Sequence, residues 1–507
     1  MSAIDQKRIA KNTLLLYVRI GVVMLVGLYT SRVVLDALGE VDYGVYSAVG
    51  TIVLMFSFLN STLASVCQRF FSFEMGRDDY LELHHTFCIS LLVFVVLAVV
   101  VVVLLETAGM WFLNNKMQLA GRYDAAVLVY HCATASFVFQ ILRTPYMGMV
   151  VAREKMKVFA YISVIEAAAT LLAAILLQHS TSDRLVFYAV LILGVQVIVS
   201  AAYYLYCRLC YTECRYKFYF DKKKFLELFS FTGWETFSGM AVVARNYGLN
   251  LLINMFFGPI LNTPRQVAQK VYMSILQLQS NFYLAVKPQI IKSYASGAVN
   301  EMQGLLCQSI RFSYYLLLVA SVPLLMETQF VLDIWLKDVP QYAVLFTRLM
   351  IINGLIDVVV NPLGAAIQAS GRIKWYQLFY GSTLLLILPL SYVGLKVFRF
   401  GPESVFYIPI VVAFFAQFIR VYFAKRLAQV SIRSVWHSVR CIILVTVVSF
   451  VLPILLSDLM PDNFGKSFAM LVSSFLWTLV CIYVIGITSD ERKQFNSAVL
   501  KKLQFYR

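Results

Sequence analysis

The chain has 507 residues, of which 60% are hydrophobic and 14% are charged, and its mean hydropathy is +0.75. Because a soluble domain has nearer a quarter of its residues charged, this composition excludes an ordinary soluble protein and predicts a polytopic membrane protein. The net charge of +16 does not indicate a nucleic-acid partner, since lysine and arginine gather in the cytoplasmic loops of membrane proteins.

Hydrophobic runs recur along the whole chain and predict about fourteen transmembrane helices, since about 20 residues cross a bilayer. The expected fold class is therefore an all-α polytopic membrane protein. The predicted spans are 13–36, 43–66, 86–106, 123–143, 157–178, 184–207, 228–257, 264–287, 305–326, 340–366, 375–396, 404–424, 435–457 and 464–487.

The loop charges predict the orientation of these spans. Most of the 43 lysines and arginines fall in the connections on the side of the N-terminus, which places both termini in the cytoplasm. This assignment counts Arg143, Arg311 and Arg420 among the inner segments and Arg265 among the outer ones.

An internal repeat relates the two halves of the chain. The segment RVVLDALGEVDYGVYSAV resembles LNLLINMFFGPILNTPRQVA, so that Gly39 aligns with Gly258, and six spans separate equivalent points. An even number of spans gives a parallel repeat, which indicates two six-helix bundles. The predicted parts are an N-terminal lobe at 1–207, a basic cytoplasmic linker at 208–227, a C-terminal lobe at 228–424, and two additional helices with a basic amphipathic tail at 425–507.

Neither the cysteines nor the loops indicate an enzyme. Three of the nine cysteines cluster, at Cys207, Cys210 and Cys214, but no histidine nearby supplies a fourth zinc ligand. We therefore expect reduced thiols and no bound metal or other cofactor. No glycine loop of the ATP-binding kind is present, and no outer loop reaches the size of a catalytic domain.

Charged side chains inside the predicted spans are the candidate functional groups, because such groups normally face a bundle interior or a watery cavity. Five cations lie there, which predicts a cationic cavity: Arg19, Arg32, Arg245, Lys270 and Arg348. The carboxylates are Glu166, Glu235 and Asp357. Two of the cations have simpler alternative roles. Arg32 is spaced to pair with Asp36 along one helix, and Arg19 is placed to reach the cytoplasmic surface.

Polar stripes accompany these charges in the second half of the chain. Asn246, Asn250 and Asn254 share a helix face with Glu235, while Asn353, Asp357 and Asn361 form a second stripe. A third stripe comprises Gln266, Lys270, Ser274, Gln277 and Asn281. Polar residues also join membrane helices to one another, so each asparagine alone has a structural alternative. Together the stripes predict a polar cavity, lined by Asn246, Asn250, Asn353, Gln277 and Asn281, with more of the coupling groups in the second half.

Several segments resemble the Wzx-type polysaccharide flippases of the multidrug/oligosaccharidyl-lipid/polysaccharide (MOP) exporter superfamily. They are RVVLDALGEVDYGVY, PYMGMVVAREKMKVFAYISVIEA, NTPRQVAQKV with PQIIKSYASG, VLDIWLKDVPQYA and NPLGAAIQASGRIKWYQ. The resemblance implies two six-helix bundles plus two helices in the bacterial inner membrane. It further implies alternating access that moves an undecaprenyl-diphosphate-linked oligosaccharide to the outer leaflet.

The resemblance also implies roles for the charged residues. The five cations would receive the diphosphate, and Glu235 and Asp357 would bind a coupling Na⁺ or H⁺, by their position in the fold. Expected partners are the lipid-linked oligosaccharide, membrane lipids, and polysaccharide polymerase and glycosyltransferase proteins, with the chain itself a monomer. The alternatives are a lipid II flippase or a cation-coupled multidrug exporter of the same fold; a polysaccharide polymerase or ligase would need a large outer loop.

Overall fold

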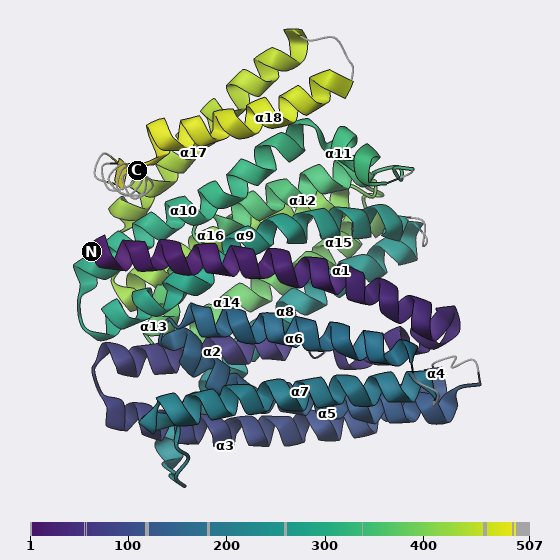
Figure 1. Ribbon diagram of the computed structural model, residues 1–507. Helices are drawn as coiled ribbons and strands as arrows, with labels where there is room; N and C mark the ends of the chain where they lie inside the picture. Colours follow the sequence, from purple (N-terminus) through teal and green to yellow (C-terminus); the bar gives the residue numbers. More distant parts are fainter. Residues whose placement is uncertain are drawn as a thin grey trace, which may run out of the picture. The chain divides into compact units, whose positions relative to one another are not determined.

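The computed structural model describes residues 3–54, 56, 58–116, 121–179, 183–257, 261–336, 338–459, 464–488 and 491–492. All regular structure in these residues is helical, which confirms the predicted all-α class (Figure 1). The predicted amphipathic tail lies almost entirely outside the described residues, as does Gly258 of the repeat.

The helices follow the predicted order along the chain. Their bounds are α1 (Ala3–Leu54), α2 (Phe58–Gly76), α3 (Tyr80–Leu104), α4 (Met110–Lys116), α5 (Tyr123–Ala152), α6 (Met156–Gln178), α7 (Arg184–Cys210), α8 (Lys222–Phe257), α9 (Asn262–Ala295), α10 (Val299–Met326), α11 (Thr328–Trp335), α12 (Ala343–Val358), α13 (Leu363–Ala369), α14 (Lys374–Leu385), α15 (Ile387–Lys396), α16 (Ser404–Ala428), α17 (Ile432–Leu459) and α18 (Phe464–Cys481).

The chain divides into two compact units, one from Ile9 to Gly239 and the other beginning at Met240. The division falls inside α8, whose first half belongs to the first unit and whose second half belongs to the second. The six-helix lobes and the linker at 208–227 remain predictions.

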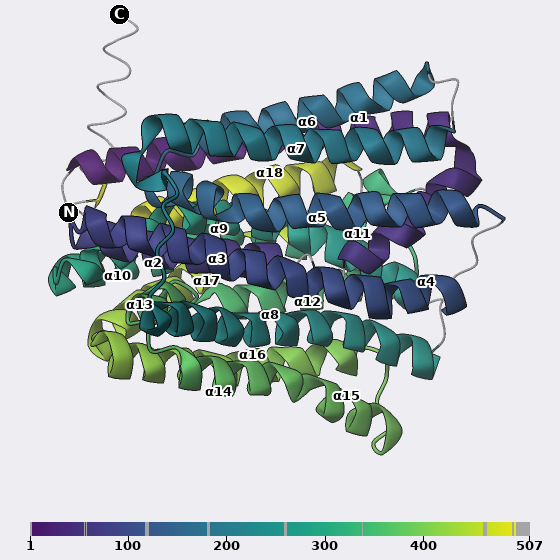
Figure 2. The ribbon, with the colours of Figure 1, turned by 90° about the horizontal axis from the view of Figure 1, so that it is seen from below.

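In the first unit α5 is the central helix and packs on α2, α3 and α7 (Figure 2). A small residue permits one of these approaches, because a Cβ on Gly148 would lie 2.5 Å from the Cβ of Cys67 on α2. On the other side of the unit, Val33, Val34 and Ala37 of α1 pack against α6 and α7.

The first helix is longer than predicted. It bends at Gly39, where φ is 74° and ψ is 171°, a backbone conformation that glycine adopts without steric cost. Helix resumes at once and runs to Leu54, and α2 begins at Phe58. The predicted span at 43–66 is therefore not one helix, because its residues are divided between α1 and α2.

In the second unit α10 packs on α9, α12, α17 and α18, and α16 packs on α12, α13 and α14. The two last helices are joined by a hydrogen bond from Trp477 Nε1 to the carbonyl oxygen of Val448, at 3.0 Å. Between α9 and α12 the backbone of Gly354 lies so close to the ring of Tyr272 that an added Cβ would come within 2.2 Å of it.

Within the described residues, 10 helices are long and apolar enough to cross a membrane, and up to 11 if the bent pair α12–α13 counts as one span. Helices α2, α8 and α9 are not among them. All three overlap predicted spans, and α8 and α9 carry polar stripes discussed above, which accounts for the difference from the predicted fourteen.

Candidate functional site

A cavity of about 430 Å³ lies within the first unit, between α1, α6 and α7. Its wall combines one guanidinium, one carboxylate and several hydroxyl groups with apolar side chains. The lining residues are Arg19, Val23, Val26, Gly27, Thr30, Ser31, Val34, Tyr43, Tyr46, Ser163, Glu166, Ala167, Thr170 and Tyr188. Such a lining offers both donors and acceptors to a polar ligand.

Arg19 is half-buried in the wall of this cavity, and its guanidinium lies 4.6 Å from the centre of the Phe159 ring. Its Nε is buried and has no hydrogen-bond partner among the described residues. A buried donor without a partner is costly, so this atom is poised to bind an acceptor brought by a ligand or by water.

Glu166 is bound by two side chains that the sequence did not connect to it. Arg143 Nη2 of α5 and Gln196 Nε2 of α7 each donate to Glu166 Oε1, at 3.2 Å. Arg143 Nη1 also donates to Gln196 Oε1 at 3.1 Å, which closes a triangle. Tyr203 lies within electrostatic range of Arg143 and Glu166. The carboxylate is therefore neutralised inside the unit.

The other predicted residues of the first unit lie apart from this cavity. Arg32 is exposed on α1, as is Asp36. Glu235 is 8% exposed in the first half of α8, where Thr232 and Ser238 are also buried. None of these residues lines the cavity described above.

In the second unit an arginine that the sequence had assigned to an outer loop joins α8 to α9. Arg265 is buried, and it donates to Asn250 Oδ1 at 3.1 Å and to the carbonyl oxygen of Asn246 at 2.8 Å. The guanidinium of Arg245, which is half-buried, acts on Arg265 electrostatically. Two like charges thus lie near each other between these helices, and an anion placed there would be stabilised.

Asp357 also has an arginine partner. Arg420 of α16 is buried; its Nη1 lies 3.5 Å from Asp357 Oδ1 and donates to the carbonyl oxygen of Asp357 at 2.8 Å. The same guanidinium donates to the Tyr380 hydroxyl and to Gln417 Oε1. This cluster ties α12, α14 and α16 together, so a coupling cation at Asp357 would have to compete with Arg420.

The residues of the stripe predicted on α9 differ in their exposure. Gln266, Lys270, Ser274 and Gln277 are all exposed, at helical spacing. Asn281 is instead buried and donates to the carbonyl oxygen of Gln277. The face is therefore available to solvent or ligand over its first three turns.

Two further predicted residues lie on α12. Arg348 is exposed, and its Nε donates to Thr328 Oγ1 at 3.2 Å. Asn353 is half-buried, and its Oδ1 is buried without a hydrogen-bond partner among the described residues. Asn353 thus presents an acceptor that a ligand or water can satisfy.

The sequence misplaced four arginines. Arg143, Arg265, Arg311 and Arg420 were assigned to loops but lie inside α5, α9, α10 and α16, and Arg311 is ion-paired with Glu491 at 2.6 Å. The predicted spans 123–143, 264–287, 305–326 and 404–424 already contain these positions, and only the count of loop charges placed the four arginines in connections. Helical spacing could not have found the contacts of Arg143 with Glu166, of Arg420 with Asp357, or of Arg265 with α8, because each joins two different helices.

The clustered cysteines form no metal centre. Cys207 and Cys214 are buried, and Cys210 is exposed. A hydrogen bond with Cys207 together with burial raises the pKa of Cys214 well above its usual value. Among the described residues, no three His, Cys, Asp or Glu side chains are placed to hold a metal ion.

Solved structures with the same arrangement of helices are membrane transporters. An outward-facing multidrug resistance MATE family transporter of the MOP superfamily matches 84% of this chain and 96% of its own, with a TM-score of 0.71 and 13% identity. A MATE in complex with MaD3S matches with a TM-score of 0.70 and 14% identity, again over 84% of this chain and 96% of its own. A MOP superfamily transporter from Pyrococcus furiosus, in which a binding pocket of reverse polarity suggests a different function, gives 0.68 at 13% identity, with 84% and 96% covered.

No family model matches the sequence, and no curated protein is detectably similar to it. At this level of identity the similarities show the fold alone. The chain has a multi-pass helical fold like that of the MATE transporters over most of its length. The structures it resembles are transporters and not enzymes.

Proposed function

We propose that this chain is a flippase that moves an undecaprenyl-diphosphate-linked oligosaccharide from the inner to the outer leaflet of the bacterial inner membrane by alternating access. The product would supply O-antigen, capsule or exopolysaccharide synthesis. The resemblance to Wzx-type flippases and the MATE fold support the proposal, as does the charge of the helix interiors.

The observation that carries the proposal is the surplus of guanidinium groups within the helices. A diphosphate carries about two negative charges, which arginine meets with paired hydrogen bonds. In the first unit Arg19 lines a cavity, and its buried Nε has no partner among the described residues; in the second unit the charges of Arg245 and Arg265 repel each other. Bringing an anion between such groups relieves their mutual repulsion.

A multidrug exporter is the second candidate, and the fold supports it equally. A cationic drug would need uncompensated carboxylates, and two of the three intramembrane carboxylates are already bound by arginine. Glu166 contacts Arg143 at 3.2 Å, and Asp357 contacts Arg420 at 3.5 Å. This pairing favours an anionic cargo. The same charge argument applies to a lipid II flippase, whose cargo differs in its sugar.

Coupling to an ion gradient belongs to the same proposal. Glu235 and Asp357 are the assigned groups for Na⁺ or H⁺, and Asp357 would bind the ion in exchange for Arg420. Net transport requires that ion or cargo bind one conformation more tightly than the other. The proposed working unit is a monomer that receives cargo from glycosyltransferases and delivers it to a polymerase.

The test is a flipping assay in proteoliposomes with a fluorescent undecaprenyl-diphosphate oligosaccharide. Arg19→Ala and Arg245→Ala should each slow flipping at least tenfold, and Arg19→Lys should retain more activity than Arg19→Ala. Lys157→Ala removes an exposed cation outside the cavity and should leave the rate unchanged.

Cationic-drug efflux is measured in the same vesicles to separate the two candidates. Drug efflux without lipid flipping would establish the exporter instead. Normal flipping in both arginine variants would refute the cationic site.

A further inference from the structure

The segment between α7 and α8 is held in a defined conformation. It comprises residues 211–221, which include a short 3₁₀ turn at Thr212–Cys214 followed by a stretch without regular secondary structure. We call it the connecting segment. Since α7 is long and apolar enough to span the bilayer and ends at Cys210, the segment starts where a membrane helix ends.

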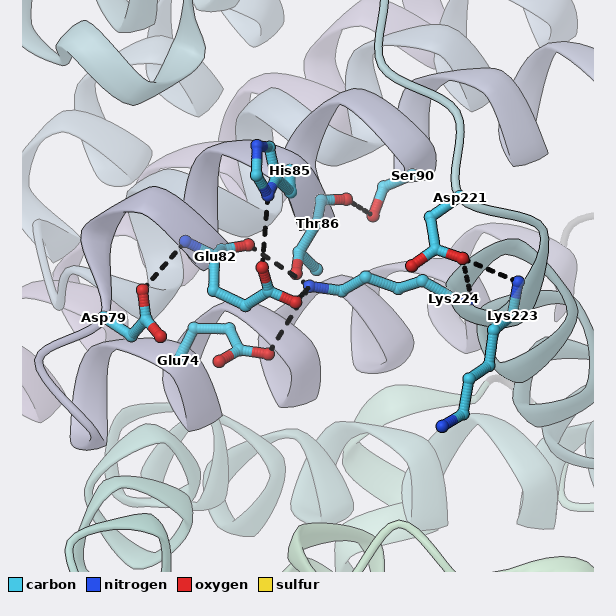
Figure 3. Close-up of polar contacts among 9 residues, drawn as sticks. All are labelled: Glu74, Asp79, Glu82, His85, Thr86, Ser90, Asp221, Lys223 and Lys224. Atoms are coloured by element: carbon cyan, nitrogen blue, oxygen red, sulfur yellow. Dashed lines mark hydrogen bonds and ion pairs between the residues drawn. The ribbon is translucent and has the colours of Figure 1, made fainter.

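A buried lysine fastens the end of the connecting segment to α2 and α3 (Figure 3). Lys224 Nζ pairs with Glu82 Oε1 and lies 3.9 Å from Glu74 Oε1. Glu82 in turn contacts His85 Nδ1 at 3.2 Å, and the His85 ring stacks on Tyr219, with centroids 3.8 Å apart and planes 4° from parallel.

The acidic side chains of the connecting segment are engaged inward. Glu213 accepts from Arg153 Nη2 at 2.8 Å, and its carbonyl oxygen lies 2.9 Å from His84 Nδ1. Asp221 accepts from the backbone amide of Lys223 at 2.8 Å and so caps the start of α8. Arg153 therefore neutralises the Glu213 carboxylate, and the Asp221 carboxylate is held at the N-terminus of α8.

The outer surface of the segment is aromatic. Tyr216, Phe218 and Phe220 present large exposed rings, whereas the neighbouring Tyr219 is half-buried. The first three are 52%, 77% and 52% exposed. We call these three residues the aromatic row. It continues onto α8 through ring contacts from Phe220 to Phe225, at 5.7 Å.

Exposed cations flank the aromatic row on both sides. They are Arg208, Arg215, Lys217, Lys222 and Lys223. Large exposed aromatic rings interleaved with lysine and arginine are typical of surfaces that lie at a membrane interface, where the rings enter the headgroup region and the cations meet anionic lipid. In water these rings would remain exposed, and exposed apolar surface is unfavourable in free energy.

We propose that the connecting segment binds the anionic headgroups of the leaflet next to it, with the aromatic row inserted among them. The occupant is assigned by charge complementarity and by position at the end of a membrane helix. The contacts of Lys224 and Tyr219 hold the row outward, so the surface is preformed and does not have to fold on the lipid. The proposal is independent of the cargo.

The experiment uses the full chain in nanodiscs and bromine-labelled lipid as a quencher. Phe218→Trp places a reporter in the aromatic row, and its signal is the difference from the unsubstituted protein. At equal mole fraction, brominated phosphatidylglycerol should quench this signal at least twofold more than brominated phosphatidylcholine does. In the same background, Lys217→Gln, Lys222→Gln and Lys223→Gln together should abolish the preference.

A matched control removes three exposed cations elsewhere, by Lys425→Gln, Arg426→Gln and Arg433→Gln, and should keep the preference. Equal quenching by both lipids would overturn the assignment to anionic headgroups. Absence of quenching by either lipid would show that the row faces water or a protein partner and would overturn the proposal. Loss of the preference in the control would attribute the effect to net charge and refute it too.

Discussion

Removing the Arg420 guanidinium should destabilise the second unit far more than neutralising its partner. Arg420 is buried, and its guanidinium binds the backbone carbonyl of Asp357, the Tyr380 hydroxyl and Gln417 Oε1. Arg420→Met deletes all of these hydrogen bonds and leaves the Asp357 carboxylate without its cation.

The expected cost follows from these contacts. Breaking a buried ion pair by removing one partner costs about 3–5 kcal/mol. Asp357→Asn leaves the 2.8 Å bond to the backbone carbonyl intact and changes only a 3.5 Å contact of a side chain that is 31% exposed. Its cost should therefore be about 1 kcal/mol, as for a partly exposed pair. The asymmetry between the two variants is the prediction.

Both variants and the double variant should be compared by thermal unfolding of the purified protein in one detergent. Arg420→Met should lower the midpoint clearly, and Asp357→Asn only slightly. If Asp357→Asn costs as much as Arg420→Met, the backbone contact does not carry the stability and the reasoning fails. Flipping by Asp357→Asn, measured with and without an ion gradient, then tests coupling in a protein that is still folded.

Two further predictions concern packing and pH. Gly354→Ala should cost about 1–3 kcal/mol, because its Cβ would meet the Tyr272 ring, whereas Gly304→Ala, with open space around its Cβ, should be neutral or slightly stabilising in the same unfolding assay. Partial burial alone would raise the pKa of Asp183, but hydrogen bonds, that from Arg122 foremost, outweigh this and hold the pKa below its usual value. The Arg122–Asp183 pair should therefore stabilise the fold above about pH 4, and this stabilisation should be lost as pH falls through the lowered pKa of Asp183. Asp183→Asn should flatten the dependence of the unfolding midpoint on pH in this range. An unchanged dependence would contradict the assignment.

Local features of the fold were predictable from the sequence because they depend on composition along one segment. Apolar runs identified the positions of the helices, and Gly39 marked the bend in α1, since only a residue without a Cβ accepts that backbone conformation at no cost. The end of α1 at Leu54 and the start of α2 at Phe58 were missed because the sequence from 51 to 59 is largely apolar and contains no proline or glycine.

The partners of the charged residues could not be predicted, because they depend on which helices meet. Glu166 and Arg143 are 23 positions apart, and Asp357 and Arg420 are 63 positions apart. No helical period relates such positions; packing between helices brings them together. The expectation that the second half would hold more of the polar machinery also rested on stripes within single helices. The first unit also has a polar cavity, which no stripe of polar residues along a single helix predicted.

One of the nine cysteines is a native site for chemical labelling. Cys210 is exposed at the end of α7, whereas the other eight thiols are buried or half-buried. A maleimide dye or spin label applied to the unmodified, folded chain should therefore react first at Cys210, beside the connecting segment. Probe mobility there, and its response to lipid composition, become accessible to spectroscopy with no cysteine introduced and none removed.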